Sequence, residues 1–443
     1  MDKVKLKQKV CIAIDSNVSK IAAYATDVAK EPELGFKETK TAAKMAAVFD
    51  ELGIEYRAGL AITGVKGRVH GGKKGPTIAV ISELDAIGCA DSLQANPLTG
   101  AAHACGHNIQ QAAMIGAAYG LVKSGVLAEL AGDVVFFGVP AEEYVELDYR
   151  KQLIAEGKIH FLHGKGELIY LGEFDDIDMA MQIHSDKNMP KPTVSIGQSS
   201  NGFVGKTVQY IGKTAHAADA PDQGINALNA AMLGLMGINA LRETFREKDV
   251  IRVHPIITKG GDLVNSVPSD VRIETYVRAK TMEAMEATNI KIDAALRAGG
   301  AAIGAKVIID TLPGQLPLIC NNTLNNLFVD NAKIANPKVE IKDSGHFSAS
   351  TDMGDVSHLM PVIHPFIGGT TGLLHTKDFC VVDFDAAAIL PAKTFAMMII
   401  DLLADDGMQA KAILAEHKPV LTKEEYVKKL DGYFSKYDEN QYF

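Results

Sequence analysis

The hydrophobic positions of the first two hundred residues fall into short apolar runs separated by helical segments. Asp15–Gly53 has helical spacing with one break. Three runs, Pro76–Ile87, Gly132–Glu143 and Asp176–Asp186, read as buried strands because each is short, apolar and bounded by polar residues. A further helical pattern covers Asn108–Gly125. Strands that alternate with helices predict an α/β domain with a mainly parallel central sheet.

The order of elements changes after residue 201. Two helical segments, about Gln223–Phe245 and Met282–Gly299, alternate there with strand-like runs in the order β-α-β-β-α-β. This split β-α-β arrangement is typical of a small ferredoxin-like α+β domain. We therefore predict that residues 1–201 and 314–443 form one α/β domain. Residues 202–313 are predicted to form a smaller domain inserted into it.

Composition narrows the classes of protein. A chain of 443 residues, 47% hydrophobic and 22% charged, is expected to form more than one globular core. The net charge of -9 argues against general binding to nucleic acid or to an anionic membrane. The N-terminal segment lacks the apolar core of a signal peptide, and no apolar run is long enough to span a bilayer. Five scattered cysteines do not suggest a disulfide framework. We expect a cytoplasmic protein.

Acidic and histidine side chains follow the three predicted strands. Asp85 ends the first run, Glu142 and Glu143 end the second, and His184 lies near the end of the third. Ligands of open α/β sheets collect at the carboxyl ends of the strands, which lie side by side. We therefore expect these four side chains to surround one small site.

Two further segments carry residues that bind metals. Cys105 and His107 lie at alternate positions just before a helix, so both can face one ion. His375 follows a loop rich in glycine and threonine. Thiolate and imidazole suit zinc, whereas carboxylates suit harder ions such as manganese. The residues alone leave a metal site and a purely structural role as open alternatives.

Several motifs occur in one order along almost the whole chain. They are LDAI (Leu84–Ile87), HACGHN (His103–Asn108), PAEE (Pro140–Glu143), GKTAHAADAPDQGINALNA (Gly212–Ala230), VNSVPSDVRIETYVR (Val264–Arg278), STDMGDVS (Ser350–Ser357) and LLHTKDF (Leu373–Phe379), preceded by PELGFKETKTA (Pro32–Ala42). Together they resemble the amidohydrolase branch of the di-metal aminoacylase and carboxypeptidase metallopeptidase family. That branch includes hippurate, auxin-conjugate and aminobenzoyl-glutamate hydrolases. HACGHN and STDMGDVS look most like the aminobenzoyl-glutamate hydrolase and peptide-dipeptidase group.

The resemblance implies a role for each matching residue. Two divalent ions, Zn²⁺ or Mn²⁺, would be held by a set of five ligands: Cys105, His107, Glu143, His184 and His375. Glu142 would be the general base, and Asp85 would orient a histidine ligand. His216, reaching across a dimer interface, would polarise the scissile carbonyl, while Asn265 and Arg278 would hold the substrate and its carboxylate. One departure is Glu83, which occupies the place of a metal-binding histidine in the wider family.

We expect a metal-dependent amidohydrolase acting on a small N-acyl amino acid, a dipeptide or an aminobenzoyl-glutamate-like substrate. The resemblance also implies that residues 1–201 and 314–443 form the catalytic domain and that the inserted domain, residues 202–313, serves as a lid or in dimerisation. The protein is expected to be a homodimer formed through the inserted domain, with no nucleic-acid or membrane partner. Two alternatives stay open. The chain could be a catalytically inactive metal-binding or sensor relative of the same fold, or a thiol-dependent hydrolase with Cys105 as nucleophile.

Overall fold

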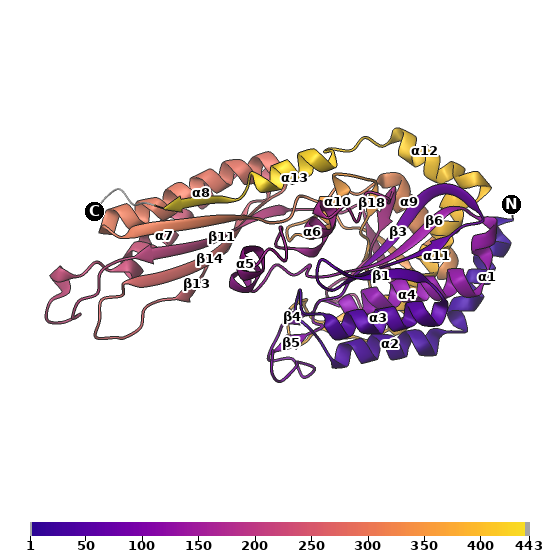
Figure 1. The fold of residues 1–443 in the computed structure, drawn as a ribbon, viewed down its shortest axis with the longest axis horizontal. Helices are drawn as coiled ribbons and strands as arrows, with labels where there is room; N and C mark the ends of the chain where they lie inside the picture. The colour runs from indigo at the N-terminus through magenta and orange to yellow at the C-terminus, as the bar shows by residue number, and fades with distance from the viewer. Residues whose placement is uncertain (1, 439–443) are drawn as a thin grey trace. The chain divides into compact units, whose positions relative to one another are not determined.

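The computed structural model describes residues 2–438 and has a mixed α/β architecture with several sheets (Figure 1). The chain divides into two compact units. The first comprises residues 1–198, 319–346 and 355–423, and the second comprises residues 199–318, 347–354 and 424–443. Each unit is described by itself below.

The first unit is built on a six-stranded sheet. In spatial order its strands are β1 (Glu55–Leu60), β2 (Gly64–His70), β6 (Ala131–Val139), β3 (Lys73–Glu83), β7 (Met179–Met181) and β18 (Val362–Ile363). The last four strands are parallel to one another, whereas β1 and β2 add two antiparallel pairings. The sheet is therefore mixed, with a parallel half. The buried run Pro76–Glu83 explains why β3 lies inside that half, because a strand covered on both faces is apolar throughout.

Helices cover this sheet and fill the core of the unit. They are α1 (Lys3–Asp15), α2 (Val18–Lys30), α3 (Thr39–Leu52), α4 (His107–Lys123), α5 (Leu147–Ala155), α6 (Gly164–Tyr170), α9 (Asn322–Ala335), α11 (Leu390–Leu403) and α12 (Met408–Glu416). Helix α4 packs against α1, α2, α11 and β3 (Figure 1). Gly116 permits this close packing, since a Cβ there would lie 2.7 Å from the Cβ of Ala392 in α11.

One described segment, Asp385–Leu403, which contains α11, has the length and apolar composition of a membrane span. From the sequence we had expected no apolar run long enough to span a bilayer. Of its most apolar window, 89% is buried inside the protein, as in the central helix of a core.

The second unit contains an antiparallel sheet with two helices packed on it. The strands in spatial order are β12 (Arg252–Val253), β14 (Asp270–Ala279), β11 (Gly202–Ile211), β15 (Lys306–Pro313) and β22 (Ser435–Asp438), and β13 (Ile256–Lys259) also pairs with β14. Helices α7 (Ala227–Leu241) and α8 (Met282–Ile303) lie against this sheet. Alternate residues of β14 are buried, as expected for a strand with one covered face.

The second unit also takes in residues that we had assigned to the catalytic domain, namely 347–354 and those from 424 onward. Strand β22 pairs antiparallel with β15, so the C-terminal segment completes an edge of the second sheet. Lys429, in α13 (Lys423–Asp431), donates to Glu286 of α8 at 2.7 Å. The β15–β22 pairing and the Lys429–Glu286 contact join residues far apart in the sequence, so no local pattern could predict them.

Candidate metal centre

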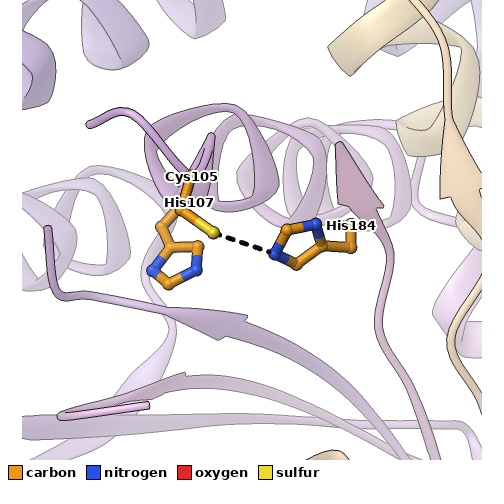
Figure 2. Close-up of side chains that lie close together, drawn as sticks. All are labelled: Cys105, His107 and His184. Atoms are coloured by element: carbon orange, nitrogen blue, oxygen red, sulfur yellow. Dashed lines mark hydrogen bonds between the residues drawn. The ribbon is translucent and has the colours of Figure 1, made fainter. Parts of the chain in front are cut away.

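Cys105 lies in a sharp turn between β5 (Ala101–Ala102) and α4, close to two histidines. Its Sγ is 3.3 Å from Nε2 of His184 and 3.3 Å from Nε2 of His375. Gly106 allows the turn, because its φ of 84° suits glycine and a Cβ there would lie 2.5 Å from Ser185 Oγ. Figure 2 shows Cys105 and His107 projecting from the start of α4 toward the same space that His184 faces.

Five of the predicted ligands form two overlapping sets. Cys105, His107 and His184 form one set, and Cys105, Glu143 and His375 form the other. Within each set the potential ligand atoms all lie within 4.8 Å of one another. Cys105 belongs to both sets, so the same sulfur atom is a potential ligand in each.

Asp85 connects the two sets through hydrogen bonds. His107 Nδ1–H donates to the main-chain oxygen of Asp85 at 2.9 Å, and Oδ1 of Asp85 lies 3.3 Å from the same nitrogen. The other carboxylate oxygen of Asp85 accepts the N–H of Glu143 at 2.9 Å. A neutral His107 with its proton on Nδ1 presents the lone pair of Nε2 toward the cluster. Asp85 therefore contacts both the His107 ring and the main chain of Glu143.

The donor atoms fit a divalent metal. Nε2 of His107 and Oε1 of Glu143 are buried and make no hydrogen bond with the described residues, although each has one close neighbour of possible opposite charge: Glu83 Oε2 at 3.1 Å and His375 Nε2 at 3.0 Å. A buried polar atom without such a bond is costly, and metal coordination would remove that cost. The thiolate, the three imidazoles and the carboxylate are all ligands that zinc takes in proteins, and the carboxylate also suits manganese.

Glu142 and Glu83 form a third set with His107. Glu83 is fully buried and accepts hydrogen bonds from Lys165 Nζ and Gln182 Nε2, both at 2.7 Å. The lysine charge compensates Glu83, whose Oε2 lies 3.1 Å from His107 Nε2. Glu83 and Lys165 were absent from the predicted site. The position of Glu83 two residues before Asp85 could have indicated the first, but no local pattern marks a buried lysine from another helix.

Without metal, charges within the cluster shift the acidities of its members. Burial and the Glu143 carboxylate oppose ionisation of Cys105, but His184 and His107 outweigh them and lower its pKa to about 6. Burial likewise opposes ionisation of Glu143, yet His375 lowers its pKa to about 2. Partial burial lowers the pKa of His375, but Glu143 and Cys105 raise it to about 11. In the metal-free state, imidazolium protons thus balance the thiolate and carboxylate.

His375 and His103 occupy different surroundings. His375 has a φ of 63°. Its main-chain N–H donates to the main-chain oxygen of Ala104 at 2.9 Å, which connects its loop to the HACGH segment. Non-glycine residues with such φ values are strained and concentrate at functional sites. His103 belongs to none of the three sets, and burial lowers its pKa to about 3.

The remaining predicted residues lie in the second unit. His216 and Asn265 are exposed on adjoining loops, where the N–H of Ala217 donates to the main-chain oxygen of Asn265 at 2.9 Å. Arg278 lies on β14, and its Nη1 donates to Ser350 Oγ at 2.8 Å. Its guanidinium is 5.0 Å from the ring centre of Phe203. Within this unit the structure thus brings His216 and Asn265 together.

Comparison with known proteins identifies the family. The family model described as "Peptidase family M20/M25/M40" matches residues 82–397, which is more than half of the chain. The chain belongs to this peptidase family. The match confirms the resemblance inferred from the motifs and the expected class of enzyme, a metal-dependent amidohydrolase. It spans all ten residues of the predicted site.

Relatives in the M20 family cover most of the chain at modest identity. The Xaa-Arg dipeptidase of Mus musculus is 28% identical over 90% of this chain and 89% of its own length. A p-aminobenzoyl-glutamate hydrolase of Escherichia coli is 26% identical over 94% and 95%. A Bacillus subtilis structure described as a dinuclear metal binding peptidase of the same family has a TM-score of 0.64 at 20% identity, covering 88% of this chain and 99% of its own. That structure supports the fold.

Glu38 is a buried acid next to the site, and it lies outside the residues that the M20 family model matches. Its two carboxylate oxygens accept the N–H of Ala141 at 2.8 Å and the hydroxyl of Thr63 at 2.7 Å. Burial, followed by the charge of Asp85, raises the pKa of Glu38 from 4.5 to about 7. Folded Glu38 therefore holds its proton more tightly than unfolded Glu38 does.

This shift predicts how stability depends on pH. The contribution of Glu38 to the unfolding free energy is most favourable below pH 4.5 and is lost as the pH rises through about 7. Relative to the Glu38→Gln variant, which does not titrate, the wild type should lose up to ~3 kcal/mol across this range. Urea denaturation of both metal-free proteins at low and high pH measures the difference. A stability gap independent of pH would contradict the prediction.

Proposed function

We propose that the chain hydrolyses the amide bond of a dipeptide or a small N-acyl amino acid, including aminobenzoyl-glutamate-like substrates. Two divalent metal ions, Zn²⁺ or Mn²⁺, would be held by Cys105, His107, Glu143, His184 and His375. The observation that carries the proposal is the place of Cys105 in both ligand sets. Its thiolate would therefore be available as a ligand in each set, in a site where two ions would supply an activated water and a Lewis acid.

The protein residues then divide the work of hydrolysis. When bound, the metal ions would supply an activated water and polarise the amide carbonyl. Glu142, buried beside His107, takes a proton from that water and delivers it to the leaving amine. The neighbouring Glu83 accepts hydrogen bonds from Lys165 and Gln182, so its carboxylate is held within the protein.

His216 is proposed to stabilise the developing negative charge on the carbonyl oxygen. Its Nδ1 accepts main-chain N–H groups from Asp219 at 3.0 Å and from Ala218 at 3.3 Å. A neutral ring that accepts at Nδ1 carries its proton on Nε2. The exposed Nε2–H is therefore a donor of fixed tautomer, which is the property that an oxyanion-stabilising group needs.

Arg278 and Asn265 are proposed to bind the substrate and its carboxylate. The Arg278 guanidinium lies 5.0 and 5.3 Å from the ring centres of Phe203 and Tyr276, and it donates hydrogen bonds to Ser350 at 2.8 Å and to His254 at 3.2 Å. A guanidinium restricted in this way is pre-organised to form a two-pronged contact with a carboxylate. Dipeptides and p-aminobenzoyl-glutamate, which the names of the relatives specify, both carry a free carboxylate.

We further propose a homodimer in which His216 completes the site of the partner subunit. The second unit exposes apolar side chains on α7 and β13, where monomeric proteins usually carry polar ones: Met232, Met236, Ile256 and Ile257 are between 43% and 62% exposed. Burial of such side chains between two copies of the unit would stabilise a dimer.

A thiol-dependent hydrolase is the main enzymatic alternative, because the lowered pKa of Cys105 and its contacts with His184 and His375 also suit a nucleophile. Loss of activity in EDTA and its recovery with Mn²⁺ or Zn²⁺ would support the metal centre. Activity that resists EDTA but is lost after iodoacetamide treatment would support the thiol mechanism instead. A protein that binds metal but cleaves no substrate would support the inactive relative.

The substitution Glu142→Gln tests the role of the base. It should lower kcat by ~10²–10⁴-fold because proton transfer is lost, while two metal ions per chain remain bound. Metal analysis and kinetics on a panel of dipeptides, N-acyl amino acids and aminobenzoyl-glutamate measure both quantities. Near wild-type turnover would remove Glu142 from this role.

Mixing two defective variants tests the shared site. His216→Ala alone should reduce kcat by ~10²–10³-fold. Equilibrating it with Glu142→Gln should restore up to about a quarter of wild-type activity, because half of the dimers are mixed and each holds one complete site. The activity of each variant alone is the control. No recovery after verified subunit exchange would place His216 in the same subunit as the base it serves, or outside the site.

A further inference from the structure

The two glutamates of the proposed site follow a strained turn. Ala141, which directly precedes Glu142, has a φ of 51°, a conformation that costs energy in any residue with a side chain. Such a turn persists only where its surroundings hold it in place. The directions of the Glu142 and Glu143 side chains depend on this backbone, so whatever holds the turn also positions the base and the ligand.

Glu38 holds the turn from one side. Its fully buried carboxylate accepts the N–H of Ala141 at 2.8 Å and is itself fixed by the Thr63 hydroxyl at 2.7 Å. The nearby Gly35 has no side chain, which allows its segment to pack closely against the turn at Ala141. A Cβ on Gly35 would lie 2.9 Å from the Cα of Ala141 and 2.8 Å from a guanidinium nitrogen of Arg150.

Arg150 holds the turn from the other side. It is only 1% exposed, and its guanidinium donates hydrogen bonds to the main-chain oxygens of Glu143 and Leu162. The rings of Phe36 and Tyr144 lie 5.3 and 5.7 Å from the guanidinium carbon, close enough for cation–π contact. The buried Arg150 guanidinium therefore links the Glu143 main chain to the loop before α6 through Leu162. It also links that main chain to the segment that carries Glu38 through the ring of Phe36.

We propose that Glu38 and Arg150 are positioning residues that hold the turn 140–143, so that Glu142 is aimed at the reacting water and Glu143 at its metal. This assignment rests on the proposed function. It gives the PELGFKETKTA segment, which lies outside the family match, a direct part in the reaction geometry. Asp85, which accepts the N–H of Glu143, is the third buried group that fixes this main chain.

Four variants test the assignment: Glu38→Leu, Glu38→Gln, Arg150→Met and Arg150→Lys. Glu38→Leu and Arg150→Met should each lower kcat by ~10²-fold with little change in KM, since a displacement of about 1 Å at the reacting groups has this effect. They should also weaken Mn²⁺ binding by the apoprotein by ~10–100-fold, because Glu143 loses its support.

The conservative variants separate positioning from general stability. Glu38→Gln should stay within ~5-fold of wild type because its amide oxygen still accepts the Ala141 N–H. Arg150→Lys should remain as defective as Arg150→Met because an ammonium on a flexible stem cannot reproduce the fixed fork. Asp249→Leu is the control: Asp249 is also buried, 8% exposed, and accepts a hydrogen bond from Arg246 Nε at 2.7 Å in the second unit, which does not contain residues 140–143.

Two readouts keep the outcomes distinct. Mn²⁺ titration of each apoprotein tests the turn even if no substrate is cleaved, so failure of the proposed function would not be mistaken for failure of this assignment. If Glu38→Leu does not fold, Arg150→Lys decides by the same measurements. The assignment is overturned if Mn²⁺ binding and kcat in these variants change no more than in Asp249→Leu, or if Glu38→Gln is as defective as Glu38→Leu.

Discussion

The contact of one buried sulfur with two imidazoles underlies the chemistry of the first unit. Cys105 Sγ lies 3.3 Å from both His184 and His375, and Glu143 and His107 complete the two sets that share it. A thiolate and carboxylates gathered in a buried site require positive charge nearby. Without metal, that charge comes from histidines whose pKa values are raised, as at His375. The same donors, once deprotonated, offer lone pairs to divalent ions.

The place of the site could be predicted from the sequence because its residues follow the strands of the parallel half-sheet. Asp85 lies just beyond β3, Glu142 and Glu143 just beyond β6, and His184 just beyond β7. The apolar runs predicted the strands. Because parallel strands end at a common edge of the sheet, the residues that follow them were expected to lie close together. The helix α1 was not predicted, although Leu6, Val10 and Ile14 have the spacing of one buried helical face.

The support of the site was beyond the reach of local patterns. Glu38, Arg150 and Lys165 are charged residues in polar segments, where exposure is the usual outcome. Their burial depends on partners far away in the sequence, such as the turn at Ala141 and the carboxylate of Glu83. The same applies to β22, which joins the second sheet only because β15 offers a free edge. The sequence motifs contain the proposed metal ligands and the proposed base. The buried residues that contact them depend on tertiary packing and could not be recognised from a local pattern.

The shared sulfur makes the central claim accessible to one measurement, the number of metal ions bound to Cys105→Ala. After equilibration with Mn²⁺ or Zn²⁺ and removal of free ions, the wild type should retain about two ions per chain. Cys105→Ala should retain fewer than one, because both ligand sets lose the same member. Cys320→Ala, which alters a cysteine outside both sets, should match the wild type. A Cys105→Ala protein that still binds two ions with wild-type affinity would contradict the account.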